Sequence, residues 1–333
     1  MKSLAFLIVS VGLAVNAQAT AGRAAGAEPV RLLFDTDLES DVDDVGAVAV
    51  LHALADDGAV EILGMGLSVR HPWSAPCLDA LNTYYGRPDV PIGVPKGKAP
   101  DSGSKYARTV AAEFPHDLRS ADDAPDVVAL YRKTLAAQPD GGAVLVSVGF
   151  LTNVARLLES PADGVSPATG VELVRKKVRC WVCMGGGFPS GREWNISQDT
   201  PSSRKALELW PRPIPVVFSG FEIGSAIATG RGLKATPASS PVRRSYELYN
   251  GLADRQSWDQ TAVLYAVRGL DGGLADVWDL RTGGNVEVLE DGTNRWRDAP
   301  DRGHSYLVRK VPPAEVARRI EALMVRPPRR SPR

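Results

Sequence analysis

The sequence contains few of the residues and segments that mark several common classes of protein. Cysteine occurs three times and histidine four times in 333 residues, and 39 basic residues balance 39 acidic ones. Three cysteines form at most one disulfide and leave one thiol over. The balanced charge gives no reason to expect a nucleic-acid partner. No internal repeat and no linker rich in proline, glycine or serine divides the middle of the chain. The sequence therefore predicts a single domain over residues 29–325.

No apolar run is long enough to cross a membrane, which takes about 20 residues. The apolar run Leu4–Val15 has Lys2 before it and the small residues of Ala17–Ala19 after it. This pattern predicts a cleavable signal peptide over residues 1–19, followed by a linker over residues 20–28. The mature protein is then secreted or periplasmic, and a retained membrane anchor is the alternative.

Two of the cysteines, Cys180 and Cys183, have the CxxC spacing, and the third is Cys77. A zinc site built from CxxC motifs needs a second pair, which the sequence lacks. The segment Val178–Met184 is typical of a core strand, so we interpret Cys180 and Cys183 as small apolar core residues. A redox pair is the alternative.

Runs typical of strands alternate with runs typical of helices along most of the chain. Strands separated by helical patterns of about ten to fifteen residues predict crossover units and a parallel sheet. The expected fold is α/β, with a mostly parallel sheet flanked by helices. After the first strand and helix, the expected elements are Val60–Val69, Ala75–Tyr85, Val127–Ala137, Ala143–Val148, Thr152–Glu159, Val178–Met184, Thr200–Leu209, Ile214–Phe218 and Asp259–Val267.

The C-terminal part of the chain has a different pattern. Val277–Val311 contains Gly-Gly and Asp-Gly pairs, which are typical of turns between short antiparallel strands. We therefore expect a small antiparallel extension. A last helix, Pro313–Met324, follows, and the basic segment 326–333, rich in proline and arginine, is predicted to be disordered.

Negative charge is concentrated between the first expected strand, Val30–Phe34, and the first expected helix, Val45–Leu51. Two like charges 4 Å apart repel by roughly 4 kcal/mol at an effective dielectric near 20, and a helix N-terminus offsets only about 0.3 to 1 kcal/mol per group. A divalent cation accounts better for the cluster, because Ca²⁺ and Mg²⁺ bind carboxylate oxygens. The acidic residues of this turn are Asp35, Asp37, Glu39, Asp41, Asp43 and Asp44.

Three other interpretations of the acidic turn can be weighed on the sequence. A solvated loop is disfavoured, because the strand before it is apolar and open α/β sheets bind ligands at the carboxyl ends of such strands. An EF-hand loop starting at Asp35 needs glycine at its sixth position and glutamate at its twelfth, where the chain has Ser40 and Gly46. A phosphatase of the haloacid dehalogenase type would use Asp35 and Asp37, but it leaves the two aspartates before the helix unexplained.

Further motifs follow later strands or open later helices. Three consecutive glycines allow a ligand to approach the backbone, although no Gly-Lys-Ser/Thr follows them to make a P-loop. Thr152, Asn153 and Asp259 are also ordinary candidates for helix caps. The motifs are Gly149–Asn153, Met184–Gly187, Glu193–Asn195 and Trp258–Asp259.

Together these motifs resemble, in the same order, the landmarks of the inosine-uridine-preferring nucleoside hydrolases. The resemblance covers roughly residues 30–267. It implies an open, mostly parallel sheet flanked by helices, and hydrolysis of the N-glycosidic bond of ribonucleosides around one tightly held Ca²⁺. The five matching motifs are Asp35-Thr36-Asp37 with Asp43-Asp44, Leu151-Thr152-Asn153, Met184-Gly185-Gly186, Glu193-Trp194-Asn195 and Trp258-Asp259.

The resemblance implies a metal shell and a catalytic base. Asp37 is similar to the calcium ligand that acts as general base on a metal-bound water. Asp44 resembles the bidentate ligand, Thr152 the ligand through its backbone carbonyl, and Asp259 the last carboxylate of the shell. Asp35 resembles a supporting carboxylate at the floor of the site.

The resemblance also implies how the ribose is held. Asp43 is similar to the residue that accepts a hydrogen bond from a ribose hydroxyl, and Glu193 and Asn195 resemble the pair that holds the sugar. Cleavage passes through a positively charged, oxocarbenium-like sugar, which surrounding carboxylates stabilise.

The sequence departs from the family pattern in the acidic turn and in the second expected loop. Leu38–Val42 is longer than the usual spacer between the two pairs of aspartates, a form associated with exported members, so Glu39 or Asp41 could add a metal ligand. The asparagine-rich loop that contacts the sugar in the family is replaced near Ser68–Trp73.

Trp258, which we also expect to contact the substrate, stands where purine-cleaving members carry a histidine that protonates the leaving base. An indole cannot deliver a proton at neutral pH. Either no acid replaces that histidine, or His71 or His304 supplies the proton from a loop.

The sequence as a whole favours a calcium-dependent hydrolase acting on a small ribosyl substrate. The alternative from another class is a nonenzymatic, calcium-bound protein that binds ribose or a nucleoside. Retention of Asp37 favours the enzyme, because a binding protein needs no base. The sequence leaves both a monomer and a homo-oligomer open.

Overall fold

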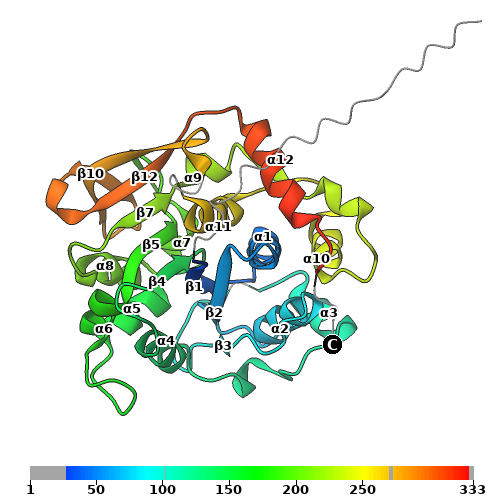
Figure 1. Cartoon of the computed structure of the whole chain (residues 1–333), viewed down its shortest axis with the longest axis horizontal. Helices are drawn as coiled ribbons and strands as arrows, with labels where there is room; N and C mark the ends of the chain where they lie inside the picture. The colour runs from blue at the N-terminus through cyan, green and yellow to red at the C-terminus, as the bar shows by residue number, and fades with distance from the viewer. Residues whose placement is uncertain (1–27, 102, 270–272, 330–333) are drawn as a thin grey trace, which may run out of the picture.

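The computed structural model describes residues 28–101, 103–269 and 273–329 (Figure 1). The predicted signal peptide, residues 1–19, lies outside the described residues, as does the predicted linker except for Glu28. Both therefore stay predictions.

A ten-stranded sheet forms the centre of the molecule, in the order β3-β2-β1-β4-β5-β7-β12-β10-β11-β6. From β3 to β12 every neighbouring pair is parallel, and the remaining three pairs are antiparallel. The strands are β1 (Val30–Thr36), β2 (Val60–Leu67), β3 (Ile92–Gly93), β4 (Ala143–Ser147), β5 (Val178–Met184), β6 (Ser190–Gly191), β7 (Val216–Ser219), β10 (Trp278–Val288), β11 (Asn294–Asp298) and β12 (His304–Arg309).

Helices cover both faces of the parallel part of the sheet, because its strands are apolar on both faces. On β1, Leu32 and Phe34 pack into one core layer and Leu33 into the other. Helices α1, α10, α11 and α12 lie on one side in Figure 1, and α4, α5, α6 and α8 lie on the other. The first group is α1 (Asp43–Asp56), α10 (Pro241–Asn250), α11 (Trp258–Arg268) and α12 (Pro313–Met324), and the second is α4 (Val127–Ala136), α5 (Thr152–Glu159), α6 (Gly170–Lys177) and α8 (Thr200–Leu209).

The order of the strands places a ligand crevice at the end of β1. The chain runs from β1 outward to β2 and β3, and then returns to β4 on the other side of β1. Such a reversal separates the loops that leave the carboxyl ends of β1 and β4, and open α/β sheets bind ligands there. Both loops come close together at Gly149, where an added Cβ would lie 2.4 Å from the backbone nitrogen of Asp37.

The expected fold class is confirmed. Most expected elements are present within two residues of their predicted ends, and β5, α5, α8 and α12 have the predicted bounds. The antiparallel extension is also present, although its last strand, β12, returns to pair in parallel with β7 and so joins the main sheet.

The remaining elements are short or polar and had no clear pattern in the sequence. Helix α2 (Ser74–Tyr84) is the expected helix after β2. The elements that the sequence did not predict are α3 (Ala107–Glu113), η1 (Ala121–Asp123), α6, α7 (Trp194–Gln198), α9 (Phe221–Gly224), β8 (Ala228–Thr229), η2 (Arg231–Ala235), α10, β9 (Arg255–Gln256) and η4 (Pro300–Arg302), together with strands β3 and β6.

The basic tail makes contacts that its composition did not suggest. Arg326 donates two hydrogen bonds of 2.9 Å to the carboxylate of Asp57, and Arg329 forms an ion pair with the same carboxylate. The ordered chain thus continues to residue 329, because arginine side chains find acidic partners at the end of α1. Residues 330–333 lie outside the described part.

The cysteines are free thiols. Cys183 is fully buried in β5, and Cys180 lies on the same strand. Residues three apart on a strand point to opposite faces of the sheet, so these two sulfurs cannot pair. The interpretation of Val178–Met184 as a core strand is confirmed.

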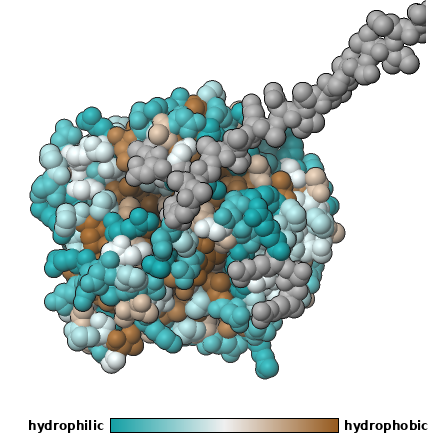
Figure 2. Space-filling model, in the orientation of Figure 1, coloured by the Kyte–Doolittle hydropathy of each residue, from teal (hydrophilic) through white to brown (hydrophobic). Residues whose placement is uncertain are grey.

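The surface is polar over most of the face in Figure 2, with hydrophobic residues gathered between the hydrophilic ones toward its middle. Within the described residues, no helix is both long and apolar enough to cross a membrane. Among the described residues, few large apolar side chains are exposed: Val165, Trp194, Phe221 and Val308.

Gly66 on β2 provides a test of the packing beneath the crevice. A Cβ at Gly66 would lie 1.7 Å from the hydroxyl of Tyr131, so Gly66→Ala must displace that ring. We expect Gly66→Ala to lower the free energy of unfolding by about 1 to 3 kcal/mol, the usual cost of overpacking. Gly164→Ala is the matched control, because nothing lies within 4 Å of the added carbon. Equal urea midpoints for the two variants would contradict this account of the packing.

Candidate functional site

A cavity of about 350 Å³ opens at the carboxyl ends of the central strands. It contains most of the site residues that the sequence predicts, together with several that it did not. The lining residues are Asp37, Ser40, Asp41, Asp43, Asp44, Val148, Met184, Glu193, Trp194, Asn195, Phe221, Tyr249, Arg255, Trp258 and Asp259.

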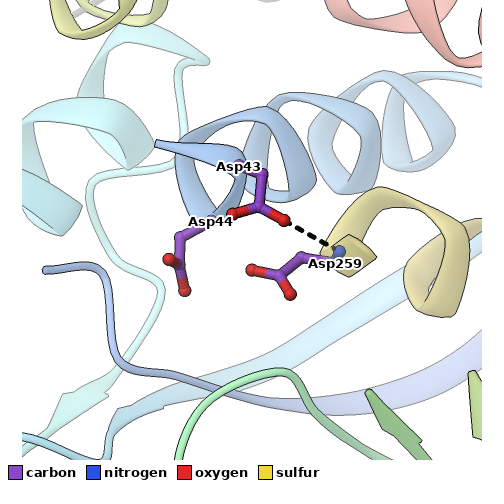
Figure 3. A group of neighbouring side chains, drawn as sticks. All are labelled: Asp43, Asp44 and Asp259. Carbon is purple, nitrogen blue, oxygen red and sulfur yellow. Dashed lines mark hydrogen bonds between the residues drawn. The ribbon is translucent and has the colours of Figure 1, made fainter. Parts of the chain in front are cut away.

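Three buried carboxylates meet in this cavity. Asp43 and Asp44 come from the first turn of α1 and Asp259 from the first turn of α11, and Figure 3 shows their carboxylates facing one space. One oxygen from each lies within 4.8 Å of the others. Burial raises the pKa of Asp43 and of Asp259 well above the usual range, and the neighbouring carboxylates raise it further. Oxygen donors so close together and so well buried fit a hard divalent cation.

Asp44 is positioned by donors from the end of β1. Its carboxylate accepts a hydrogen bond from the hydroxyl of Thr36 and one of 3.1 Å from the backbone N–H of Leu38. Leu38 has φ of 41°, a left-handed conformation that is costly for leucine, at roughly 1 to 3 kcal/mol. This conformation directs the N–H of Leu38 at Asp44, so the strained turn helps to position the carboxylate.

Asp43 joins α1 to α11. One of its oxygens accepts hydrogen bonds from the backbone N–H groups of Trp258 and Asp259, at 3.1 and 3.2 Å. These are the first two N–H groups of α11, and Ser257, at the capping position before the helix, makes no side-chain cap. Asp43 therefore caps α11 from another helix, and the alternative that Asp259 is a simple N-cap is wrong. Asp43 also belongs to the acidic trio, and its predicted contact with a ribose hydroxyl stays a prediction.

Asp37 lies beside the trio, with its side chain buried. Burial raises its pKa well above the usual range, and Asp44, Glu39 and Asp43 raise it further. Of the two extra acidic residues in the long turn, Glu39 is thus close to Asp37. Asp41 instead forms an ion pair with Arg255.

Asp35 lies below these residues as a fully buried carboxylate. It accepts hydrogen bonds from the hydroxyl of Tyr131 on α4 and, at 2.8 Å, from the amide of Asn153 on α5. Burial raises its pKa to about 7, although both hydrogen bonds act to lower it. These contacts fit the predicted supporting role. Asn153 is therefore not a helix cap, since its amide reaches back to β1.

Thr152 begins α5, where Leu151 rather than a polar residue occupies the capping position. The hydroxyl of Thr152 donates a hydrogen bond of 2.6 Å to Asp199. The predicted role of Thr152 is to bind the metal through its backbone carbonyl. The hydrogen bond of its hydroxyl does not test that role, which stays a prediction.

Glu193 and Asn195 line the cavity from the start of α7. The Glu193 carboxylate accepts hydrogen bonds from the backbone N–H groups of Asn195, Ile196 and Gly186, at 2.8, 3.1 and 3.1 Å. The Asn195 amide donates one of 2.7 Å to the carbonyl of Val148. The glycines after β5 thus let the backbone approach Glu193, and both predicted sugar-binding residues are fixed at the wall of the cavity.

Aromatic side chains border the cavity. The rings of Trp258 and Phe221 are stacked, with centroids 5.5 Å apart, and the indole N–H of Trp258 donates to the carbonyl of Phe221 at 2.9 Å. Trp194, the first residue of α7, also lines the cavity and has half of its surface exposed. Exposed flat rings of this kind can pack on a flat ligand. Phe221 had no signal in the sequence, because α9 is only four residues long.

Arg255 and Tyr249 are further cavity residues that the sequence reasoning missed. Arg255 pairs with Asp41, and its guanidinium lies 5.0 Å from the ring of Trp258 and 5.7 Å from that of Tyr249. The only hint in the sequence that Arg255 lies in the cavity was its place three residues before Trp258. Arginine is usually a surface residue, so the sequence did not distinguish a cavity position from an ordinary surface one.

The two histidines considered as acids lie outside the cavity lining. His304 is buried on β12, where its Nδ1 accepts a hydrogen bond from the backbone N–H of Val286 at 3.0 Å, and burial lowers its pKa to about 3. His71 contacts Trp73 and Ser74. Neither is among the residues that line the cavity in the described part of the chain.

Comparisons with known proteins give matches among solved structures only. No family model and no curated protein matches the chain. The plant nucleoside hydrolase PpNRh1 is 17% identical, with a TM-score of 0.64 over 90% of this chain and 100% of that one. The purine-preferring ribonucleoside hydrolase from Gardnerella vaginalis is 20% identical, with a TM-score of 0.62 over 88% and 99%. The type III effector XopQ, solved with adenosine diphosphate ribose, is 17% identical, with a TM-score of 0.64 over 89% and 92%.

These likenesses extend over nearly the whole of each chain. Their sequence identities are low, and they establish the architecture rather than the reaction. The chain has the nucleoside hydrolase fold.

Proposed function

We propose that the protein hydrolyses the N-glycosidic bond of ribonucleosides or related ribosyl compounds, with one calcium ion in the acidic cluster. The observation that carries this proposal is the buried trio of Asp43, Asp44 and Asp259 at the floor of a cavity bordered by aromatic rings. The nucleoside hydrolases among the structural neighbours support it. We also propose, from the pattern of residues 1–19, that the protein acts outside the cytoplasm.

Calcium is proposed because the donors are all oxygen. The ligands would be the carboxylates of Asp37, Asp44 and Asp259 and the carbonyl of Thr152, with Asp43 beside them. Oxygen-only sites suit Ca²⁺ and Mg²⁺ rather than zinc, and calcium tolerates the flexible, higher coordination that several aspartates supply. When bound, calcium orients water, eases its deprotonation and fixes the sugar diol.

The chain supplies the groups for a dissociative displacement at the sugar. Water attacks the anomeric carbon, the bond from that carbon to the leaving group breaks, and Asp37 takes the proton from the water. Glu193 and Asn195 hold the sugar, and the surrounding carboxylates stabilise the positive charge that develops on it.

One observation favours a second function, that of a nonenzymatic calcium-bound protein for ribose or a nucleoside. Trp258 lines the cavity, and no histidine is among the cavity's described lining residues. A protein without activation of the leaving group would bind its ligand and release it unchanged.

A panel of ribosides separates the two functions. We expect purified protein to release free ribose from at least one nucleoside or nitrophenyl riboside, as measured by a reducing-sugar assay. Tight binding of a nucleoside, measured by calorimetry, without release of ribose from any compound would favour the binding protein and overturn the hydrolase.

The metal proposal predicts about one calcium per chain by elemental analysis. Chelation should lower the melting temperature, because a ligand at 1,000 times its dissociation constant stabilises by about 4 kcal/mol. Asp259→Asn should lose most of the calcium. Asp79→Asn is the control, since Asp79 is equally buried but accepts hydrogen bonds from backbone N–H groups outside the cavity. Zinc in the purified protein, or a melting temperature unchanged by chelation, would refute the proposal.

The proposed base can be tested without removing its ligand oxygen. Asp37→Asn should retain calcium and lower kcat by roughly 10²- to 10⁴-fold, the usual contribution of a general base. Asp37→Ala should lose both metal and turnover. Turnover of Asp37→Asn close to that of the wild type would assign the base to another residue.

A further inference from the structure

Arg255 brings a positive charge into an acidic cavity. It is the one lysine or arginine among the described lining residues, and its side chain is 29% exposed. Six carboxylates line the same cavity: Asp37, Asp41, Asp43, Asp44, Glu193 and Asp259.

The guanidinium is held rigidly, yet part of it remains available. Its Nε donates to the two oxygens of Asp41 at 2.8 and 3.0 Å, and one Nη donates to the same carboxylate. The other Nη donates to Gln256 at 3.2 Å. Arginine has five N–H groups, so two of them have no acceptor among the described residues. The guanidinium also lies over the rings of Tyr249 and Trp258, which limit how far it can turn.

Glycosidic cleavage develops charge of both signs, and the cavity is lined by groups of both signs. The sugar becomes positive as the bond breaks, and the metal-site carboxylates favour that charge. The leaving group becomes negative, and a flat leaving group would pack on the rings of Trp258 and Phe221, which line the cavity. The positive charge of Arg255 lies against this aromatic wall.

We propose that Arg255 stabilises the negative charge on the departing group, with Asp41 as its positioning residue; this inference rests on the proposed hydrolase function. The electron pair of the C–N bond leaves with the nitrogen, and Arg255 donates hydrogen bonds to the resulting anion. Arginine stays protonated in proteins, so water supplies the proton to the anion after release. The indole N–H of Trp258 is already bonded to Phe221 and takes no part.

The same chemistry could bind a phosphate carried by the substrate. The guanidinium lies 5.0 Å from the ring of Trp258, on which a flat leaving group would pack, and this contact favours the leaving group over a phosphate. We therefore assign Arg255 to the leaving group, and make a phosphorylated substrate one arm of the test.

The test compares Arg255→Gln with the wild type on ribosides whose leaving groups differ in pKa. Removing one donor aimed at a developing anion costs roughly 10²- to 10³-fold in kcat. We expect that loss for inosine and a loss below about tenfold for nitrophenyl riboside, whose leaving group needs less stabilisation. KM should change little, since the charge exists only in the transition state. Arg244→Gln, which removes a bidentate ion pair with Glu113 outside the cavity, should behave as wild type.

Chemical rescue distinguishes a lost charge from a disturbed fold. Millimolar guanidinium should restore part of the kcat of Arg255→Ala on inosine and should have no effect on Arg244→Ala. The calcium content and melting temperature of Arg255→Ala, measured in parallel, report whether the site is intact.

Three outcomes would overturn the inference. Equal losses on all leaving groups, without rescue, would mean a structural role. A loss confined to inosine 5′-monophosphate would mean that Arg255 binds phosphate. Full activity of Arg255→Gln on inosine would mean no role. Failure of the wild type to cleave any riboside is a different result, because it overturns the hydrolase function itself together with this inference.

Discussion

The structure depends on a set of like charges kept together inside the protein. Asp43, Asp44 and Asp259 would separate if nothing else held them, because buried carboxylates repel strongly. They are held by donors of the chain itself: the Thr36 hydroxyl, the Leu38 backbone and the first N–H groups of α11. The fold therefore gathers these acidic groups although burial and mutual repulsion disfavour their charged forms, and a bound cation would offset that cost.

The position of β1 in the middle of the sheet explains why so many functional side chains converge. β2 lies on one side of β1 and β4 on the other, so the loop after β1 lies at the point where the strand order reverses, where open sheets have a ligand crevice. The side chains of α4 and α5 reach under that loop to hold Asp35, while α11 approaches from the other layer. The acidic and aromatic residues of the cavity and the support beneath them thus come from both layers of helices.

The sequence predicted the features that depend on residues close together in the chain. Apolar runs located the central strands, and the acidic turn after β1 located the cavity. It did not predict that Asn153 bonds Asp35, or that Asp43 caps α11, because each contact joins segments more than 100 residues apart. Arg255 was missed for the same reason, since its partner Asp41 is 214 residues away. A side chain that could equally cap its own helix is especially easy to misassign, because the cap explains the residue type without any distant contact.

The hydrogen bond between Asp43 and the backbone of Asp259 joins residues 216 positions apart. Closing so long a loop is entropically costly and slows folding. A cation that needs both residues would bind fully only once both ends of that loop are in their native places. Interactions absent from the folding transition state slow unfolding and leave the folding rate nearly unchanged. The metal would set the lifetime of the folded protein, and the sheet would set the speed of its formation.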